Sequence, residues 1–260
     1  MICGDSDIPV SDLQKFTDYA GRINVLLDTS FTTSEIGVFY PVDAVRAAYT
    51  ATGEHFDYNG SDEAAKINRL MQDTCYDILR AGYDFTVLDK QSVAKSAVSG
   101  GKMKIGAGEY SIIVMPSVSV LSCDALEKLT DFEASGGKIV WLDCTPKMCD
   151  NVNETARFNT LKSKLGGVYG GSIKNVIAEN YDTPMRARVK SGVFISEYKR
   201  TDDNKTVVYL ANSTNSVKTI TLGDGYEKYY IYDPYDCTVT EASGQSAVKI
   251  EKYRALLIVY

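Results

Sequence analysis

The sequence has 260 residues, enough for one large domain or for two smaller domains that each have a core. Hydrophobic residues make up 44% of the chain and charged residues 24%, as in ordinary globular proteins, and no apolar stretch reaches the roughly 18–20 residues of a membrane span. The net charge of −6 gives no basic surface for nucleic acid, so we expect neither a nucleic-acid nor a membrane partner.

Helical and strand patterns alternate from residue 12 to about residue 165. The first helix is predicted over residues 12–27, with Ser11 and Gln14 as a capping box at its start. Further helices are predicted over 61–82, 123–137 and 154–167, and short apolar strands over 35–41, 84–88, 110–116 and 138–144. Apolar strands separated by helices predict a parallel sheet that is covered on both faces.

After about residue 185 the helical patterns stop. Seven strand-like segments follow at intervals of roughly 8–12 residues, separated by Gly, Asn, Asp and Ser, which is typical of an antiparallel sandwich. We therefore predict three parts: a linker helix that is the remnant of a preceding domain over 1–30, an α/β domain over 31–183, and a small antiparallel β-sandwich over 184–260.

Several stretches carry a resemblance to a known group of enzymes. They are FTDYAGRINVLL, IGVFYP, YDILRAGYDFTVLD, the long run from Tyr110 to Asp143, KTVVYLANS and YYIYDPYDCTV. In this order they resemble the C-terminal portion of bacterial glycoside hydrolases, nearest to family 106 rhamnosidase-like proteins, with a layout shared by family 42 β-galactosidases. Those proteins have a catalytic (β/α)8 barrel, then an amidotransferase-like α/β domain, then a β-sandwich. The resemblance implies a flavodoxin-like or class I amidotransferase-like fold for the first domain.

The sequence departs from that layout because it contains no barrel pattern. A (β/α)8 barrel takes about 250 residues, and these 260 residues form two other domains. The resemblance therefore implies a non-catalytic module that braces a barrel, mediates assembly or lines a sugar site. It also implies carbohydrate as the ligand class, and either another copy of the chain or an adjoining catalytic barrel domain as the protein partner.

Cys144 is the candidate nucleophile of the competing hypothesis, a Cys-dependent amidotransferase-like hydrolase. In class I amidotransferases a catalytic thiol follows a strand of this kind on a sharp turn, where backbone N–H groups and a helix dipole lower its pKa. Here Pro146 removes one backbone N–H, and His55, the only histidine, precedes the cysteine instead of following it. These departures favour an inert residue at the end of a core strand.

Three further residues are candidates for ligand binding. His55 falls in the loop after the first strand of the sheet, and Asp89 and Asp143 each end a predicted parallel strand. Loops and strand ends at the carboxyl edge of an open α/β sheet line ligand sites. A solvated histidine and helix-capping or solvated carboxylates explain the same residues without any ligand.

The six cysteines are scattered and form no Cys-x-x-Cys pair, which indicates reduced and mostly buried thiols. We therefore expect no disulfide framework and no metal site, and favour cytoplasmic surroundings, since the start of the sequence has no signal-peptide pattern. Residues 50–53 (TATG) are similar to the phosphate loop of flavodoxins but begin about nine residues after the first strand. We expect no FMN and no other cofactor.

The apolar stripe of the first helix includes Phe16, Tyr19 and Ile23. Because the helix precedes the first strand of the sheet, the stripe must cover that sheet, a barrel or another subunit. In family 42 enzymes the amidotransferase-like domain supplies subunit contacts, so the resemblance implies a similar use. We predict a dimer or larger oligomer with these three residues near the contact.

Overall fold

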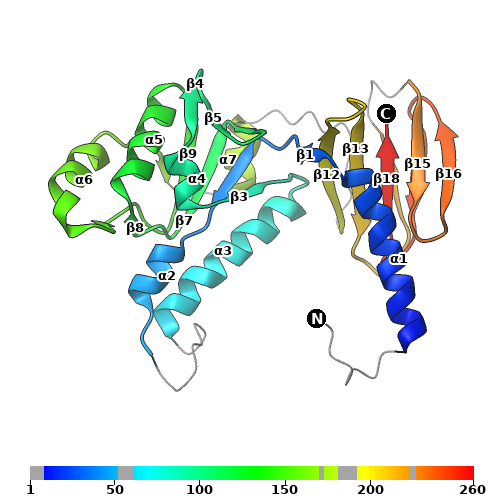
Figure 1. Cartoon of the computed structure of the whole chain (residues 1–260), viewed down its shortest axis with the longest axis horizontal. Coiled ribbons are helices and arrows are strands. Elements are labelled where there is room, and N and C mark those ends of the chain that lie inside the picture. Colours follow the sequence, from blue (N-terminus) through cyan, green and yellow to red (C-terminus); the bar gives the residue numbers. More distant parts are fainter. Residues whose placement is uncertain (1–8, 52–60, 170–172, 181–191, 223–226) are drawn as a thin grey trace. The chain divides into compact units, whose positions relative to one another are not determined.

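The computed structural model describes residues 9–51, 61–169, 173–180, 192–222 and 227–260. The chain forms two compact units (Figure 1): an α/β unit over residues 33–184, and a β unit made of residues 1–32 together with residues 185–260. The predicted domain boundary at residue 183 lies outside the described residues. No helix in the described part of the chain is long and apolar enough to cross a bilayer.

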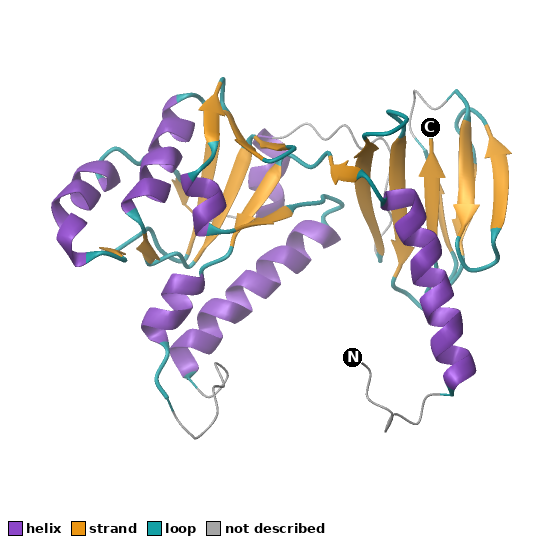
Figure 2. Ribbon diagram, in the orientation of Figure 1, coloured by secondary structure: helices purple, strands orange, loops and turns teal. Residues whose placement is uncertain are grey.

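A five-stranded parallel sheet forms the centre of the α/β unit (Figure 2). All of its neighbouring strands pair in parallel, which confirms the parallel sheet expected from the apolar runs. β2 and β7 are buried along their whole length. The strand order is β11-β9-β7-β2-β3, with β2 at Ile36–Phe39, β3 at Thr86–Leu88, β7 at Ile112–Pro116, β9 at Lys138–Leu142 and β11 at Val168–Tyr169.

Side chains along each strand point alternately to the two faces of this sheet, so each face carries an apolar core. Helices cover both of these cores. One core contains Val38 and Val114 and is closed by α3 (Asp62–Arg80) and α7 (Ile173–Asn180). The other contains Ile113 and Trp141. Its helices are α4 (Lys90–Ala94), α5 (Cys123–Ala134) and α6 (Thr155–Lys162), while α2 (Val42–Ala48) and the short η2 (Val152–Glu154) lie in the connecting segments.

Two small sheets complete the α/β unit. β4 (Ala97–Ser99), β5 (Lys102–Ile105) and β6 (Gly108–Tyr110) form an antiparallel meander. β8 (Val120–Leu121) pairs in parallel with β10 (Met148–Cys149), so the segment after β9 runs beside the segment after β7. This second pairing positions the chain at the carboxyl edge of the main sheet.

The β unit is built on a six-stranded antiparallel sheet of order β1-β12-β13-β18-β15-β16. A two-stranded antiparallel sheet of β14 (Lys218–Thr221) and β17 (Ala247–Ile250) packs on one face, where Ile220, Val248 and Ile250 join the core. The seven predicted segments correspond to β12–β18, and β1 adds an edge strand. The other bounds are β1 Ser30–Thr32, β12 Val193–Arg200, β13 Thr206–Asn212, β15 Tyr229–Asp233, β16 Thr238–Ala242 and β18 Ala255–Val259.

The predicted first helix is α1 (Val10–Leu27), and it lies against the opposite face of the six-stranded sheet (Figure 1). Tyr19 is half-buried, and burial raises the pKa of its hydroxyl, which lies near Tyr209 and the backbone of Ala255. Arg22 Nη1 donates to the carbonyl oxygen of Pro234 at 3.0 Å. No residue of α1 is fully buried, so the helix is held mainly by half-buried and polar contacts.

Candidate functional site at the carboxyl ends of the parallel strands

Ser117 and Asp143 follow the adjacent strands β7 and β9 and lie at the centre of the candidate site. Both have a left-handed backbone, with φ of 51° and 70°, which is uncommon for residues that carry a Cβ. The Ser117 hydroxyl donates to Asp143 Oδ2 at 2.7 Å. A strained backbone of this kind costs about 1–3 kcal/mol, and such residues cluster at functional sites. The two residues therefore mark this edge of the sheet as the place to look for function.

Cys144 does not occupy the strained position of the turn. Its N–H donates to the carbonyl oxygen of Leu142 at 2.9 Å, which closes a three-residue turn centred on Asp143. In a nucleophile elbow the nucleophile itself sits at the strained residue, and here that residue is Asp143. Burial, together with the neighbouring Asp143 carboxylate, raises the pKa of the Cys144 thiol above its usual value. The thiol is therefore protonated at neutral pH.

A cleft of about 570 Å³ opens beside Ser117 and Asp143. Its floor is the carboxyl edge of the sheet, and its far wall is the first half of α3, where Lys66 Nζ lies 2.6 Å from Glu63 Oε1. Charged and aliphatic groups dominate its surface. The lining residues are Ala48, Glu63, Lys66, Ile67, Leu70, Ser117, Ser119, Asp143, Cys144 and Lys147.

A second cleft of about 550 Å³ adjoins the first, and Leu70 and Asp143 line both. It lies between the second half of α3 and the start of α7. Arg80 and Lys174 bring positive charge to its wall, while Asp73 and Asp77 bring negative charge. Leu70 and Asp143 thus lie where the two clefts meet, and Asp143 brings a carboxylate to that point.

Asp89 performs a structural task at the end of β3. It is the N-cap of α4, where Oδ1 accepts from the backbone N–H groups of Gln91 and Ser92 at 2.8 and 3.0 Å. The Ser92 hydroxyl, followed by these backbone groups, lowers the pKa of the Asp89 carboxyl. Asp89 lines neither cleft, so the structure does not bring it together with Asp143.

His55 lies in the segment 52–60, outside the described residues, as do the last two residues of the TATG stretch. The three residues predicted near an assembly contact have different surroundings on α1. Phe16 is 64% exposed, whereas Tyr19 and Ile23 are half-buried. Phe16 and Tyr19 also line a cavity of about 290 Å³, together with Lys15, Tyr235, Tyr253 and Arg254.

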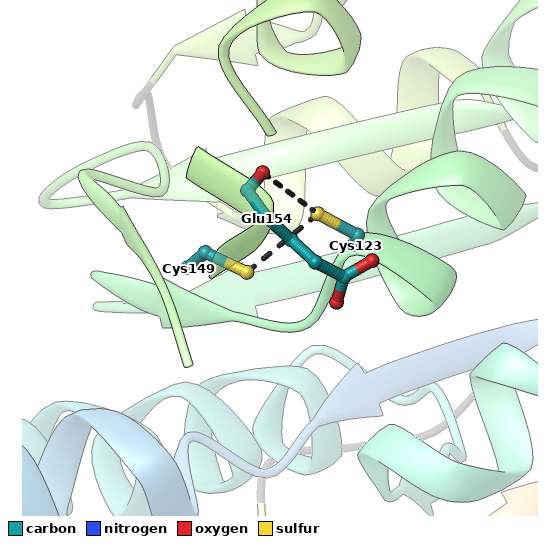
Figure 3. Close-up of side chains that lie close together, drawn as sticks. All are labelled: Cys123, Cys149 and Glu154. Atoms are coloured by element: carbon teal, nitrogen blue, oxygen red, sulfur yellow. Dashed lines mark hydrogen bonds between the residues drawn. The ribbon is translucent and has the colours of Figure 1, made fainter. Parts of the chain in front are cut away.

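The fold brings together one side-chain cluster that the sequence did not predict. Cys123, Cys149 and Glu154 place one sulfur or oxygen atom each within 4.8 Å of one another (Figure 3). Both cysteines are free thiols. The scattered spacing in the sequence had indicated reduced thiols, but it gave no sign that two of them lie side by side. No spacing rule reveals it, because the proximity depends on the pairing of β8 with β10.

Three solved structures have a similar fold. A rhamnosidase from Novosphingobium sp. PP1Y is 17% identical, with a TM-score of 0.62, and the match covers 95% of this chain and 24% of that chain. A β-galactosidase from Bacillus circulans sp. alkalophilus is 9% identical, with a TM-score of 0.64, and the match covers 96% of this chain and 45% of that chain.

A catalytic mutant of a family 42 β-galactosidase from G. stearothermophilus is 11% identical, with a TM-score of 0.61, and the match covers 99% of this chain and 44% of that chain. The chain therefore has a glycoside hydrolase-like fold, and it spans less than half the length of each of these three proteins. No protein-family model and no curated protein matches the sequence.

Proposed function

We propose that this chain is a non-catalytic C-terminal module of a glycoside hydrolase-like protein and serves carbohydrate metabolism by bracing a barrel, mediating assembly or lining a sugar site. The observation that carries the proposal is the extent of the structural likeness. At least 95% of the chain matches, but the match takes up only 24–45% of the three glycosidases. A module that accompanies a catalytic domain accounts for both figures.

The topology of the α/β unit supports the finer fold assignment. Numbered in chain order, the five parallel strands follow the order 2-1-3-4-5, which is the order of flavodoxin-like sheets. The resemblance found in the sequence pointed to the same class, through an amidotransferase-like domain. Ligands of such sheets bind at the carboxyl edge, where the Ser117–Asp143 pair lies.

The lining of the clefts favours bracing or assembly for the α/β unit. Sugar sites commonly offer aromatic rings that stack on the C–H faces of the ring, and the described lining of the two clefts contains no aromatic side chain. The β unit instead has the cavity of Phe16, Tyr19, Tyr235 and Tyr253. Lining a sugar site is the proposed role that fits the aromatic side chains of that cavity, and the same exposed surface is also the candidate contact for assembly.

The alternative function, a hydrolase that uses Cys144, has less support. A nucleophilic thiol requires a lowered pKa, and that of Cys144 is raised by burial and by Asp143. Asp143, not Cys144, occupies the strained residue of the turn. Pro146 also contributes no N–H to an oxyanion hole.

Aryl glycosides test the proposal directly. The purified chain is incubated with 4-nitrophenyl rhamnoside and galactoside, in parallel with the Glu63→Gln and Asp143→Asn variants, which remove the carboxylates of the first cleft. We expect release of nitrophenol no faster than in buffer for all three proteins. Turnover by the wild type that either variant abolishes would overturn the non-catalytic assignment.

Titration with the free sugars separates the remaining roles. Calorimetry of rhamnose and galactose binding to the wild type and to Tyr253→Ala locates any sugar site, because Tyr253 is 69% exposed in the aromatic cavity. Heat of binding that Tyr253→Ala removes supports the lining of a sugar site. Its absence in the wild type leaves bracing and assembly.

A further inference from the structure

The thiols of Cys123 and Cys149 are neighbours because two short strands pair. Cys149 ends β10 and pairs with Leu121 of β8, and the chain runs from Leu121 through Ser122 into α5, whose first residue is Cys123. The two cysteines are 26 residues apart in the sequence, yet their Sγ atoms lie 3.6 Å apart. The contact is therefore built into the backbone pairing at the carboxyl edge of the main sheet.

The surroundings of the pair are those of two thiols, not of a complete metal site. Cys123 Sγ faces the backbone carbonyl oxygen of Glu154 at 3.6 Å (Figure 3), and the N–H of Asn151 donates to Cys149 Sγ at 3.4 Å. The Glu154 carboxylate already accepts from Arg157 Nη1 at 2.8 Å. Structural zinc sites use four protein ligands, and the cluster in the described residues offers three.

We propose that Cys123 and Cys149 form a reversible disulfide bond, which fastens the segment after β9 to the start of α5. Cys144 and Lys147 line the first cleft from that segment, and Lys147 N–H donates to the carbonyl oxygen of Ser119 at 2.7 Å. The bond makes the wall of the candidate site responsive to the redox state of its surroundings. Closing it moves the sulfurs from 3.6 Å to about 2.05 Å, the length of an S–S bond.

The oxidant is a small-molecule disulfide such as glutathione disulfide. Cys149 is half-buried and Cys123 is buried, so the Cys149 thiolate attacks first, forms a mixed disulfide and releases one glutathione thiolate. The Cys123 thiolate then attacks the Cys149 sulfur, forms the intramolecular bond and releases the second glutathione. Two protein thiols are oxidised, one glutathione disulfide is reduced to two glutathione molecules, and the two thiol protons end on the glutathione thiolates.

The electrostatics of Cys123 favour a long-lived bond over a fast catalytic one. Burial, with Cys149 and Glu154 close by, raises the pKa of Cys123 to about 12. A thiolate of high pKa is a poor leaving group in thiol–disulfide exchange, so attack on Cys149 expels it slowly. The disulfide also forms slowly, because the raised pKa leaves little Cys123 thiolate at neutral pH.

The test uses the full chain, incubated with glutathione disulfide, alkylated and digested with trypsin. Lys147 separates Cys144 from Cys149, so the expected product is a disulfide-linked pair of the peptides 105–128 and 148–157. The oxidised wild type should also unfold about 5–10 °C above its reduced form, because the bond closes a loop of 26 residues. Cys149→Ser should show neither change.

Cys75→Ser is the matched control, because it replaces another free cysteine of the same unit, on α3, and should keep both changes. Three results would overturn the proposal. They are a glutathione adduct that stays on Cys149, a linkage of Cys149 to Cys144, and one equivalent of zinc in the purified chain that protects Cys123 and Cys149 from alkylation. The last result would assign the cluster to a metal.

Discussion

The hydroxyl of Ser117 donates to Asp143 Oδ2 at 2.7 Å across the ends of β7 and β9, and both residues have a positive φ. The hydrogen bond thus joins two strained positions on neighbouring strands. Substitutions of Ser117 can separate the effect of the strained backbone on stability from that of the hydrogen bond. Both glycine and alanine remove the hydrogen bond, but only glycine also relieves the strain.

We expect Ser117→Ala to destabilise the α/β unit by about 1 kcal/mol, the usual contribution of a hydrogen bond. Ser117→Gly loses the same bond but relieves the left-handed backbone, so its effect should be smaller. Guanidinium unfolding followed by the fluorescence of Trp141, the only tryptophan of the chain and fully buried in β9, measures both. A glycine variant that is less stable than the alanine variant would contradict this account of the strain.

The Cys144 thiol should be alkylated slowly at neutral pH, and its rate should rise with pH beyond the ordinary thiol value of about 8.5. The reason is that burial and Asp143 raise its pKa. Iodoacetamide labelling, read on the tryptic peptide 139–147, gives the rate at each pH. The exposed Cys237 serves as the internal comparison, and labelling of Cys144 faster than Cys237 at pH 7 would revive the nucleophile hypothesis.

The core strands were predictable from the sequence, and the geometry at their ends was not. IGVF and IIVMP are wholly buried strands because both sheet faces are covered, and this is what a continuous apolar run indicates. The apolar run 138–144 did not reveal that β9 ends at Leu142, so that Asp143 takes the strained turn in place of Cys144. A difference of two residues at a strand end is below what periodicity can resolve.

Other elements escaped prediction because they are too short for a period to appear. β4, β5 and β6 have three or four residues each, and residues 99–102 (SGGK) form a tight hairpin turn in which Gly100 and Gly101 have φ of 56° and 75°. The Cys123–Cys149 contact depends on a pairing of two-residue strands. Such contacts arise from the folded chain and leave no local pattern.

Lys90 joins three segments of the α/β unit, since its Nζ lies 2.5 Å from Asp43 Oδ2 and 2.7 Å from Asp150 Oδ2. We expect Lys90→Met to destabilise the unit by about 1–2 kcal/mol, because two carboxylates lose their cation. The effect is smaller than for a fully buried pair, since the three side chains are 16–27% exposed. Lys90→Arg is the charge-preserving control.

The stability difference between the wild type and Lys90→Met should depend on pH through the pKa of Lys90. Burial opposes the charged form, but the hydrogen bonds to Asp150 and Asp43 outweigh it and raise the pKa. The stabilisation is therefore fully present below the unfolded value of about 10.4 and is lost as pH rises through the folded value. Unfolding of wild type and Lys90→Met should differ by a constant amount from pH 6 to about 9, and a gap that closes within that range would contradict the ion pair.

Gly167 and Gly100 share a left-handed backbone, with φ of 57° and 56°, but differ in surroundings. A Cβ on Gly167 would clash with Trp141 Nε1, whereas one on Gly100 meets no atom within 4 Å. Gly100→Ala should cost about 1–2 kcal/mol from backbone strain alone, and Gly167→Ala should cost more and alter the Trp141 emission. Equal losses in guanidinium unfolding would contradict a steric role for Gly167.

The exposed aromatic side chains on and beside α1 offer a surface for assembly. Phe16, Tyr235 and Tyr253 are 64%, 58% and 69% exposed and line one cavity, so an apolar surface remains open although Tyr19 is half-buried. Exposed apolar groups gathered in one place commonly mark an interaction site. We expect sedimentation equilibrium to give a dimer or larger oligomer at micromolar concentration, and Phe16→Asp to dissociate it without lowering the thermal midpoint. Tyr19→Phe, which keeps the half-buried ring and removes only its hydroxyl, should leave the oligomer intact. A monomeric wild type would remove the basis for an assembly role, and so would an oligomer that tolerates the charge at position 16, because the aromatic surface would then face solvent in the assembled protein.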